Sequence, residues 1–263
     1  MVNNIIKFHS SHSSNNDEFN YRPSPVKNHI PQWFLDKDKH KVMDNGQYMV
    51  VFFQSEGKTV AHRMPSWKSC PALLDVFISG YYLLTPCDIV VKKHEHMCDF
   101  HGNVELEYDR NKWGANSVSP SFIEFRGKES GLPTPAGYNP HTFAWRPNWY
   151  CEVDQGYTTL VVHPINRNDL PFRTVSGFID ATNTLTGSGQ ISFYIEKDWF
   201  GTIPAGTPYA QIIPIKNESW SSEMIDHTEE ELKNQIDIKN KEYMIGHGMT
   251  KYKEQDWLKK HYE

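Results

Sequence analysis

One run of the sequence, HEHMCDFH, is dense in side chains that bind metals. On a β-strand, side chains two positions apart share a face, so His94, His96 and Cys98 would point in one direction. Imidazole and thiolate ligands at this spacing suit Zn²⁺ or Fe²⁺, and a further ligand would have to come from a distant residue such as His141 or His163. Two interpretations stay open: a metal-dependent enzyme centred on these residues, or a polar strand end that faces solvent.

The four cysteines, at positions 70, 87, 98 and 151, show no paired spacing. In a chain of this length they indicate free thiols in a reducing compartment. A nucleophilic cysteine needs a histidine within hydrogen-bond distance, and no local motif supplies one. We therefore expect buried, structural cysteines.

Three tryptophans lie close in sequence to arginines: Trp113, Trp145 and Trp149 accompany Arg126 and Arg146. Aromatic rings beside arginine can stack on bases or sugars, and they can equally anchor a protein interface. The net charge of −5 favours the interface.

The composition is that of a globular protein of 263 residues, with 38% hydrophobic and 22% charged residues. This length can bury a core without disulfides or metals. The negative net charge argues against a nucleic-acid partner. No apolar run approaches the ~18 residues of a membrane span, and the N-terminus lacks the apolar core of a secretion signal. We expect a cytoplasmic protein of a host cell, with association with a virion as an alternative.

The order of patterns along the chain predicts three parts. Residues 1–24 are polar and rich in Ser, Asn and His, which is typical of a flexible arm. Residues 25–220 read as a single β-rich domain, and residues 221–263 as a helical tail. Thr228 and Glu231 form a capping-box pattern that begins a helix over about 228–243. Strands are expected at 48–54, 88–91, 104–108, 121–126, 157–163, 175–180, 190–196 and 209–215.

Four segments resemble the motifs of dUTPases and dCTP deaminases in the same order. They are ISGYYL at 78–83, GYTTLVVHPINRNDL at 156–170, GFID at 177–180 and GTPYAQI at 206–212. The resemblance implies a mainly β fold with a dUTPase-like β-clip core at about 157–215 and long loop insertions. It also implies a trimer, because this family builds its sites between subunits.

The same resemblance assigns roles to individual residues. Asp180 falls on the carboxylate that activates water, and Gln211 falls on a glutamine near the phosphates. Asn166 and Arg167 lie in the segment that matches the phosphate loop. The reaction would require Mg²⁺ on the phosphates of a nucleotide.

Three departures weaken the catalytic assignment. Tyr82 stands where the family has an aspartate that serves the metal. Residues 165–168, INRN, replace the Arg-Ser pair of the phosphate loop, and ATNTLTG lacks the tyrosine that follows the family's water-activating aspartate. An aspartate that caps a turn after a strand is the simpler interpretation of Asp180.

The chain also resembles an uncharacterised protein family of tailed phages and bacteria. The shared features are a Cys-Pro at 70–71, a Gly-Tyr at 80–81, the strand at 156–166 and the Gly-Thr-Pro turn at 206–211. This resemblance implies no activity.

Three functions follow from these patterns. The first is a non-catalytic, oligomeric binding or virion-assembly protein. The second is a divergent nucleotide-binding hydrolase that uses Asp180, Gln211 and Arg167, and the third is a metal-dependent enzyme centred on His94 and His96. The class of any small-molecule ligand stays open.

Overall fold

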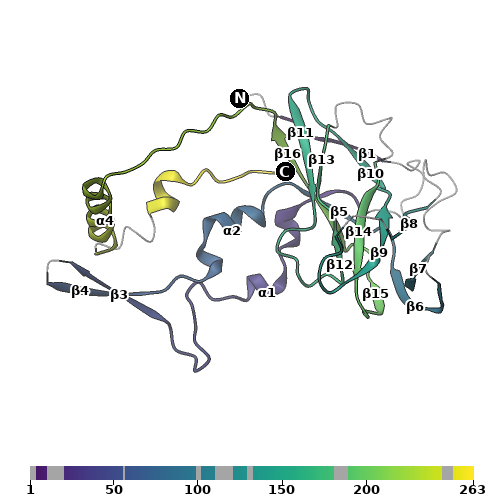
Figure 1. The fold of residues 1–263 in the computed structure, drawn as a ribbon, viewed down its shortest axis with the longest axis horizontal. Helices are drawn as coiled ribbons and strands as arrows, with labels where there is room; N and C mark the ends of the chain where they lie inside the picture. Colours follow the sequence, from purple (N-terminus) through teal and green to yellow (C-terminus); the bar gives the residue numbers. More distant parts are fainter. Residues whose placement is uncertain are drawn as a thin grey trace. The chain divides into compact units, whose positions relative to one another are not determined.

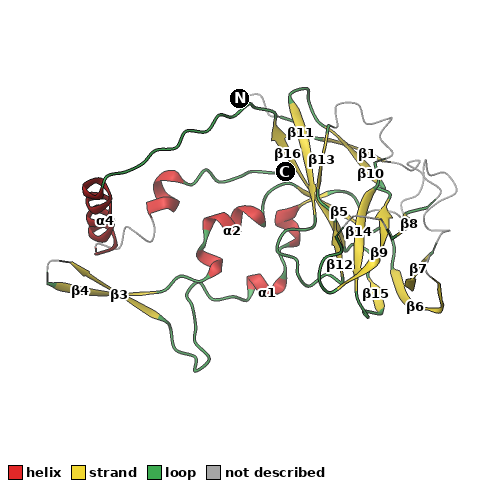
Figure 2. Cartoon of the chain, viewed as in Figure 1, coloured by secondary structure: helices red, strands yellow, loops and turns green. Residues whose placement is uncertain are grey.

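The computed structural model describes residues 4–10, 21–55, 57–98, 102–109, 121–128, 133–180, 189–244 and 251–263. It is mainly β, as the sequence predicts (Figures 1 and 2). The chain divides into two compact units. The β-rich unit comprises residues 1–28 and 80–217, and the second unit comprises residues 29–79 and 218–263. The division differs from the expected boundaries, because residues 29–79 group with the C-terminal segment.

The central sheet of the β-rich unit has five antiparallel strands. In spatial order they are β13 (Gly177–Ile179), β11 (Tyr157–Val162), β16 (Pro208–Lys216), β5 (Tyr81–Leu84) and β2 (Ser24–Pro25). The four segments that carry the dUTPase-like motifs all contribute strands to this sheet. The four motif segments are separated along the sequence, but their strands lie side by side in this one sheet.

Three smaller sheets complete the β-rich unit, with η2 (Val26–His29) following β2. The four-stranded sheet contains β12 (Phe172–Thr174), β14 (Ile191–Glu196), β9 (Tyr138–Trp145) and β8 (Ile123–Gly127). The three-stranded sheet contains β15 (Gly201–Ile203), β6 (Ile89–Cys98) and β7 (Gly102–Tyr108). The last sheet pairs β1 (Lys7–Ser10) with β10 (Trp149–Glu152).

The pairing of β1 differs from the expectation of a wholly flexible N-terminal arm. Its backbone runs antiparallel to β10, with Lys7 opposite Glu152 and His9 opposite Tyr150. The Glu152 carboxylate accepts hydrogen bonds from Lys7 at 2.6 Å and contacts the His9 ring at 2.9 Å. Backbone hydrogen bonds to β10 and the Lys7–Glu152 ion pair stabilise this polar strand. Neither interaction can be predicted from the spacing of apolar residues.

Trp145 lies at the centre of the hydrophobic core of the β-rich unit. It is fully buried, and its ring stacks on Phe193 at 3.7 Å with an interplanar angle of 8°. Its Nε1–H donates to the hydroxyl of Thr174 at 3.2 Å. The expectation of an interface residue is therefore wrong for Trp145. Trp149 packs against the same core, and Trp113 lies outside the described residues.

The second unit combines short helices with one hairpin. Its elements are α1 (Gln32–Leu35), β3 (Val50–Ser55), β4 (Lys58–Arg63), η3 (Trp67–Ser69), α2 (Pro71–Val76), α4 (Glu229–Met244) and η6 (Tyr252–Asp256). Two contacts join the distant parts of the sequence. Tyr243 of α4 stacks on Phe53 of β3 at 4.6 Å, and the indole N–H of Trp257 donates to Asp75 at 3.1 Å.

The capping box at the start of α4 is confirmed. The backbone N–H of Thr228 donates to the Glu231 carboxylate at 2.8 Å, and the N–H of Glu231 donates to the Thr228 hydroxyl at 3.3 Å. These bonds satisfy amide groups that the first turn of a helix leaves without partners. The hydrogen bonds that the carboxylate accepts from the Thr228 N–H and from the Thr228 hydroxyl lower the pKa of Glu231.

Among the described residues, we find no helix whose length and apolar character would let it cross a membrane.

Candidate functional site

The loop that follows β11 is the strongest candidate site, because it holds several of the predicted functional residues. Gln211 pairs with Val162 on one side and with Tyr82 on the other, so these residues form one row across β11, β16 and β5. Gln211 and Tyr82 are both fully buried. The row places the Gln211 amide beneath the start of the loop, where its carbonyl oxygen accepts the N–H of Ile165 at 2.9 Å.

A tight turn shapes the loop. The N–H of Arg167 donates to the carbonyl of Pro164 at 3.1 Å, and Asn166 between them has φ +61°. Few residue types adopt positive φ at the third position of such a turn, and asparagine is among those that do. The backbone therefore accounts for Asn166, which the sequence suggested as a nucleotide ligand.

The guanidinium of Arg167 is held by its own loop. Its Nε–H donates to Oδ1 of Asp169 at 2.8 Å and its terminal NH₂ to Oδ2 at 2.7 Å, which is the bidentate geometry of a strong ion pair. The Arg167 side chain is only 13% exposed. It lies beside the hydroxyl of Tyr82, where burial raises the pKa of Tyr82 to about 12 while the cation acts in the opposite direction.

His163 closes the base of the loop as a neutral ring. Its Nδ1 accepts the N–H of Thr174 at 3.3 Å, and its Nε2 lies 3.2 Å from the carbonyl of Arg167. These two partners together require a proton on Nε2 and none on Nδ1. Burial lowers the pKa of His163, which favours the same neutral state. Both ring nitrogens are thus engaged by backbone groups.

Asp180 stands apart from this loop within one chain. It follows Ile179, which pairs with Thr159 of β11, and its side chain is exposed. Gln211 lies on the other side of β11, opposite Val162. Three residues of a strand span about 10 Å, and neighbouring strands are about 5 Å apart. The structure therefore brings Gln211, Asn166 and Arg167 together and leaves Asp180 separate.

The predicted metal ligands lie on β6, but only His94 has a described side chain, which is half-buried. The side chains of His96 and Cys98 lie outside the described residues, as does His101. Among the residues that the structure does describe, no group of three or more His, Cys, Asp or Glu side chains could hold a metal ion. The site at His94, His96 and Cys98 stays a prediction. Among the described residues, Cys70, Cys87 and Cys151 form no disulfide.

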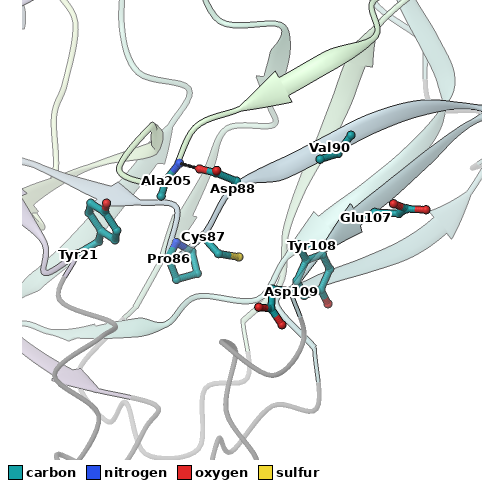
Figure 3. Close-up of a pocket in the computed structure, with 9 residues that line it drawn as sticks. All are labelled: Tyr21, Pro86, Cys87, Asp88, Val90, Glu107, Tyr108, Asp109 and Ala205. Atoms are coloured by element: carbon teal, nitrogen blue, oxygen red, sulfur yellow. Dashed lines mark hydrogen bonds between the residues drawn. The ribbon is translucent and has the colours of Figure 1, made fainter.

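A pocket of about 740 Å³ at the ends of β6 and β7 is a feature that the sequence did not reveal (Figure 3). The carboxylates of Asp88, Glu107 and Asp109 line it together with Tyr21 and Tyr108. Asp88 accepts the N–H of Ala205 at 2.7 Å, which fixes its orientation. Carboxylates repel phosphates, so this lining disfavours a nucleoside triphosphate.

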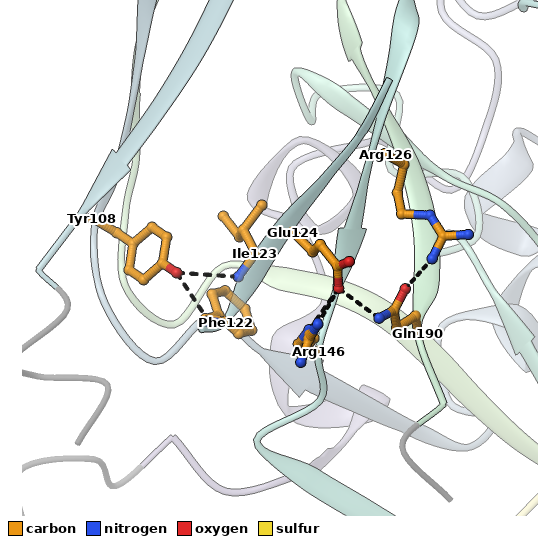
Figure 4. Close-up of polar contacts among 7 residues, drawn as sticks. All are labelled: Tyr108, Phe122, Ile123, Glu124, Arg126, Arg146 and Gln190. Carbon is orange, nitrogen blue, oxygen red and sulfur yellow. Dashed lines mark hydrogen bonds and ion pairs between the residues drawn. The ribbon is translucent and has the colours of Figure 1, made fainter. Parts of the chain in front are cut away.

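A polar network on β8 and its neighbours accounts for the two arginines that the sequence placed near the tryptophans (Figure 4). The Glu124 carboxylate accepts from Arg146 Nε–H at 2.9 Å and from Gln190 at 2.6 Å, and Arg126 donates to Gln190. The bond to Arg146 contributes most to the lowered pKa of Glu124. These hydrogen bonds give Arg126 and Arg146 partners within the protein, so the two arginines need no bound base or sugar to explain them.

Comparisons with known proteins add little to this geometry. No protein-family model matches the chain, and no curated protein is significantly similar to it. One similar solved structure is an Asp-to-Asn mutant of the dUTPase from phage phi11 of S. aureus, described as revealing the coordination of a structural Mg(II) ion. The identity is 11% and the TM-score 0.29, with 57% of this chain and 85% of that chain covered. A likeness at this level carries no argument about function.

Replacing Gln211 with leucine is expected to destabilise the β-rich unit by about 1–3 kcal/mol, because the Ile165 N–H loses its acceptor. Urea unfolding measures this loss. Limited trypsin digestion provides a second readout, since an opened loop exposes the bond after Arg167. Gln155→Leu is the matched control, because Gln155 is an exposed turn residue of the same unit. Unchanged stability and unchanged cleavage at Arg167 would show that the loop does not depend on Gln211.

Proposed function

We propose that the protein is a non-catalytic, oligomeric binding or assembly protein whose β-rich unit has a dUTPase-like β-clip fold. The fold proposal is supported by the order of the four motif segments and by their adjacency in one antiparallel sheet. The functional proposal is carried by a single observation: the loop that would hold phosphates is closed by its own residues.

The closure involves the groups that a phosphate would need. Arg167 is committed to Asp169, and the Gln211 carbonyl to the Ile165 N–H. A phosphate entering this loop would have to displace a bidentate carboxylate from a guanidinium that is mostly buried. The displaced Asp169 carboxylate would remain nearby and would repel the phosphate. The arrangement therefore stabilises the loop and disfavours an anionic ligand.

The residues present do not fit the Mg²⁺ of the dUTPase reaction. Tyr82 occupies the position of the aspartate that serves the metal in that family, and its side chain is fully buried beside the cation of Arg167. A protonated phenol offers a divalent cation no negative charge, and the neighbouring guanidinium repels it.

The oligomeric part of the proposal is supported by apolar side chains at one edge of the five-stranded sheet. In the edge strand β13, Phe178 is 68% exposed and Ile179 is 38% exposed. On the same face as Phe178, Leu160 and Ile213 are half-buried. We propose that a copy of the β-rich unit covers this surface, in a trimer by analogy with dUTPases.

Turnover measurements test the function. Purified full-length protein with Mg²⁺ is expected to release no product from a panel of deoxynucleoside and nucleoside triphosphates, and Asp180→Asn is expected to behave identically. Light scattering on the same samples is expected to give the mass of three chains or a multiple of three. Turnover that Asp180→Asn abolishes would instead establish a divergent hydrolase, and a monomeric protein would contradict the oligomeric part.

A further inference from the structure

Helix α4 presents an apolar stripe that its own unit covers only at one end. Leu232, Ile236 and Tyr243 lie one or two turns apart and so share a face of the helix. Tyr243 stacks on Phe53 at the C-terminal end. Leu232 is 46% exposed and Ile236 57% exposed, and residues 229–241 are all exposed. A helix of 16 residues gains most of its stability by packing such a stripe against another surface.

The charges along this face differ between its two ends. Glu229 lies on the stripe side of the first turn, which contains three consecutive glutamates. Lys239 lies on the same side near the other end, where its amino group is 6.0 Å from the Tyr243 ring. Glu242, an acid in the last turn, is already paired with Lys251. The stripe is thus negative at its start and positive towards its end.

This distribution is complementary to itself when the helix is reversed. In an antiparallel pair with a two-fold axis near Asn234, Leu232 lies opposite Ile236 of the second copy. The same register places Glu229 opposite Lys239 of the second copy. Each apolar contact and each ion pair occurs twice, as a two-fold interface requires. A single antiparallel register therefore gives both the apolar residues and the charged residues a partner on the second copy.

The segment before the helix provides additional apolar surface. Trp220 and Met224 are each 87% exposed, and Ile225 is 69% exposed. Two residues per helix would bury too little area for a stable dimer, so the pair would also have to cover apolar side chains of this extended segment, of which Ile225 lies nearest to the helix in sequence.

We propose that α4 binds a second copy of this chain as an antiparallel helix pair, with Leu232 against Ile236 and Glu229 against Lys239. The proposal does not depend on the absence of catalysis, and it concerns a surface other than the edge of the five-stranded sheet. It predicts a doubling of whatever assembly the β-rich unit forms.

Charge reversal tests this register. In full-length Glu229→Lys, two lysines face each other at both ends of the pair, and in Lys239→Glu two glutamates do. Each variant alone is expected to associate about tenfold more weakly or worse than the wild type. An equimolar mixture of the two variants is expected to associate again, because both ion pairs re-form in the mixed pair. Light scattering is expected to give half the wild-type mass for each single variant and the wild-type mass for the mixture.

Glu230→Lys is the matched control. It makes the same charge change about 100° around the helix from Glu229, away from the stripe, and is expected to leave the mass unchanged. Circular dichroism of every variant shows whether α4 remains helical. The proposal is overturned if the wild-type mass does not exceed that of Glu229→Lys, if Glu230→Lys has the same effect, or if the mixture fails to reassociate while all variants stay helical. Failure here leaves the turnover result untouched, so the two proposals are tested separately.

Discussion

Replacing Gly80 with alanine is expected to destabilise the β-rich unit by more than about 3 kcal/mol. Gly80 has φ +76°, a left-handed conformation that costs other residues about 1–2 kcal/mol. A Cβ atom at this position would also lie 2.1 Å from the carbonyl oxygen of Ile212 and 3.0 Å from the Ile213 side chain. Because the nearer atom belongs to the backbone of β16, the clash can be relieved only by moving β5 away from β16.

A variant at a second glycine measures the backbone strain alone, without a steric clash. Gly156 has φ +89°, and none of the described atoms would lie within 4 Å of its added Cβ. Gly156→Ala is therefore expected to cost only the conformational strain of about 1–2 kcal/mol. Urea unfolding of both variants, followed by tryptophan fluorescence, gives the difference. Equal losses would show that β5 and β16 tolerate separation and that the central sheet is loosely packed beside Gly80.

Replacing Trp145 with alanine is expected to cost about 3–5 kcal/mol, which is typical of a large aromatic residue removed from a core. The Trp145 ring contacts Phe193, Phe122, Phe172 and Tyr209, with ring centroids 3.7 to 5.4 Å apart. The substitution also removes the hydrogen bond to Thr174, a residue whose hydroxyl donates to the Tyr209 carbonyl at 2.6 Å. The expected loss of stability therefore has two causes: a cavity in the core, and a weaker hydrogen-bonded connection from Trp145 through Thr174 to β16.

Trp67→Ala is the control for this variant, because Trp67 is 69% exposed. Its replacement is expected to change the free energy of unfolding by less than about 0.5 kcal/mol. If Trp145→Ala were equally mild, the four-stranded sheet would not be packed on Trp145 as the structure shows.

Much of the strand pattern could be predicted from local sequence. Strands β11, β14 and β16 are rich in β-branched and aromatic residues, and each lies within one or two residues of its expected bounds. Strand β9 was missed because Asn139 and Pro140 interrupt its pattern, although Asn139 is buried within the strand. A local signal fails where long-range pairing compensates for unfavourable residues.

Only part of the candidate site could be predicted, because its geometry also depends on long-range pairing. The sequence located the loop after β11 and the glutamine on β16, because both follow recognisable motifs. It did not show that Tyr82, Gln211 and Val162 share one row, since strand register depends on pairing between segments far apart in the chain. Nor did it show that Arg167 turns back onto Asp169. The closure of the loop is thus a property of the folded chain.

Equilibrium binding of nucleotides to the loop tests the central claim most directly. We expect calorimetric titration of the full-length protein with dUTP and other triphosphates, in the presence of Mg²⁺, to show no saturable heat. Arg167→Met should behave in the same way, because Arg167 is already occupied by Asp169. Saturable binding by the wild type that Arg167→Met removes would contradict the account, since it would show that the loop opens to hold phosphates.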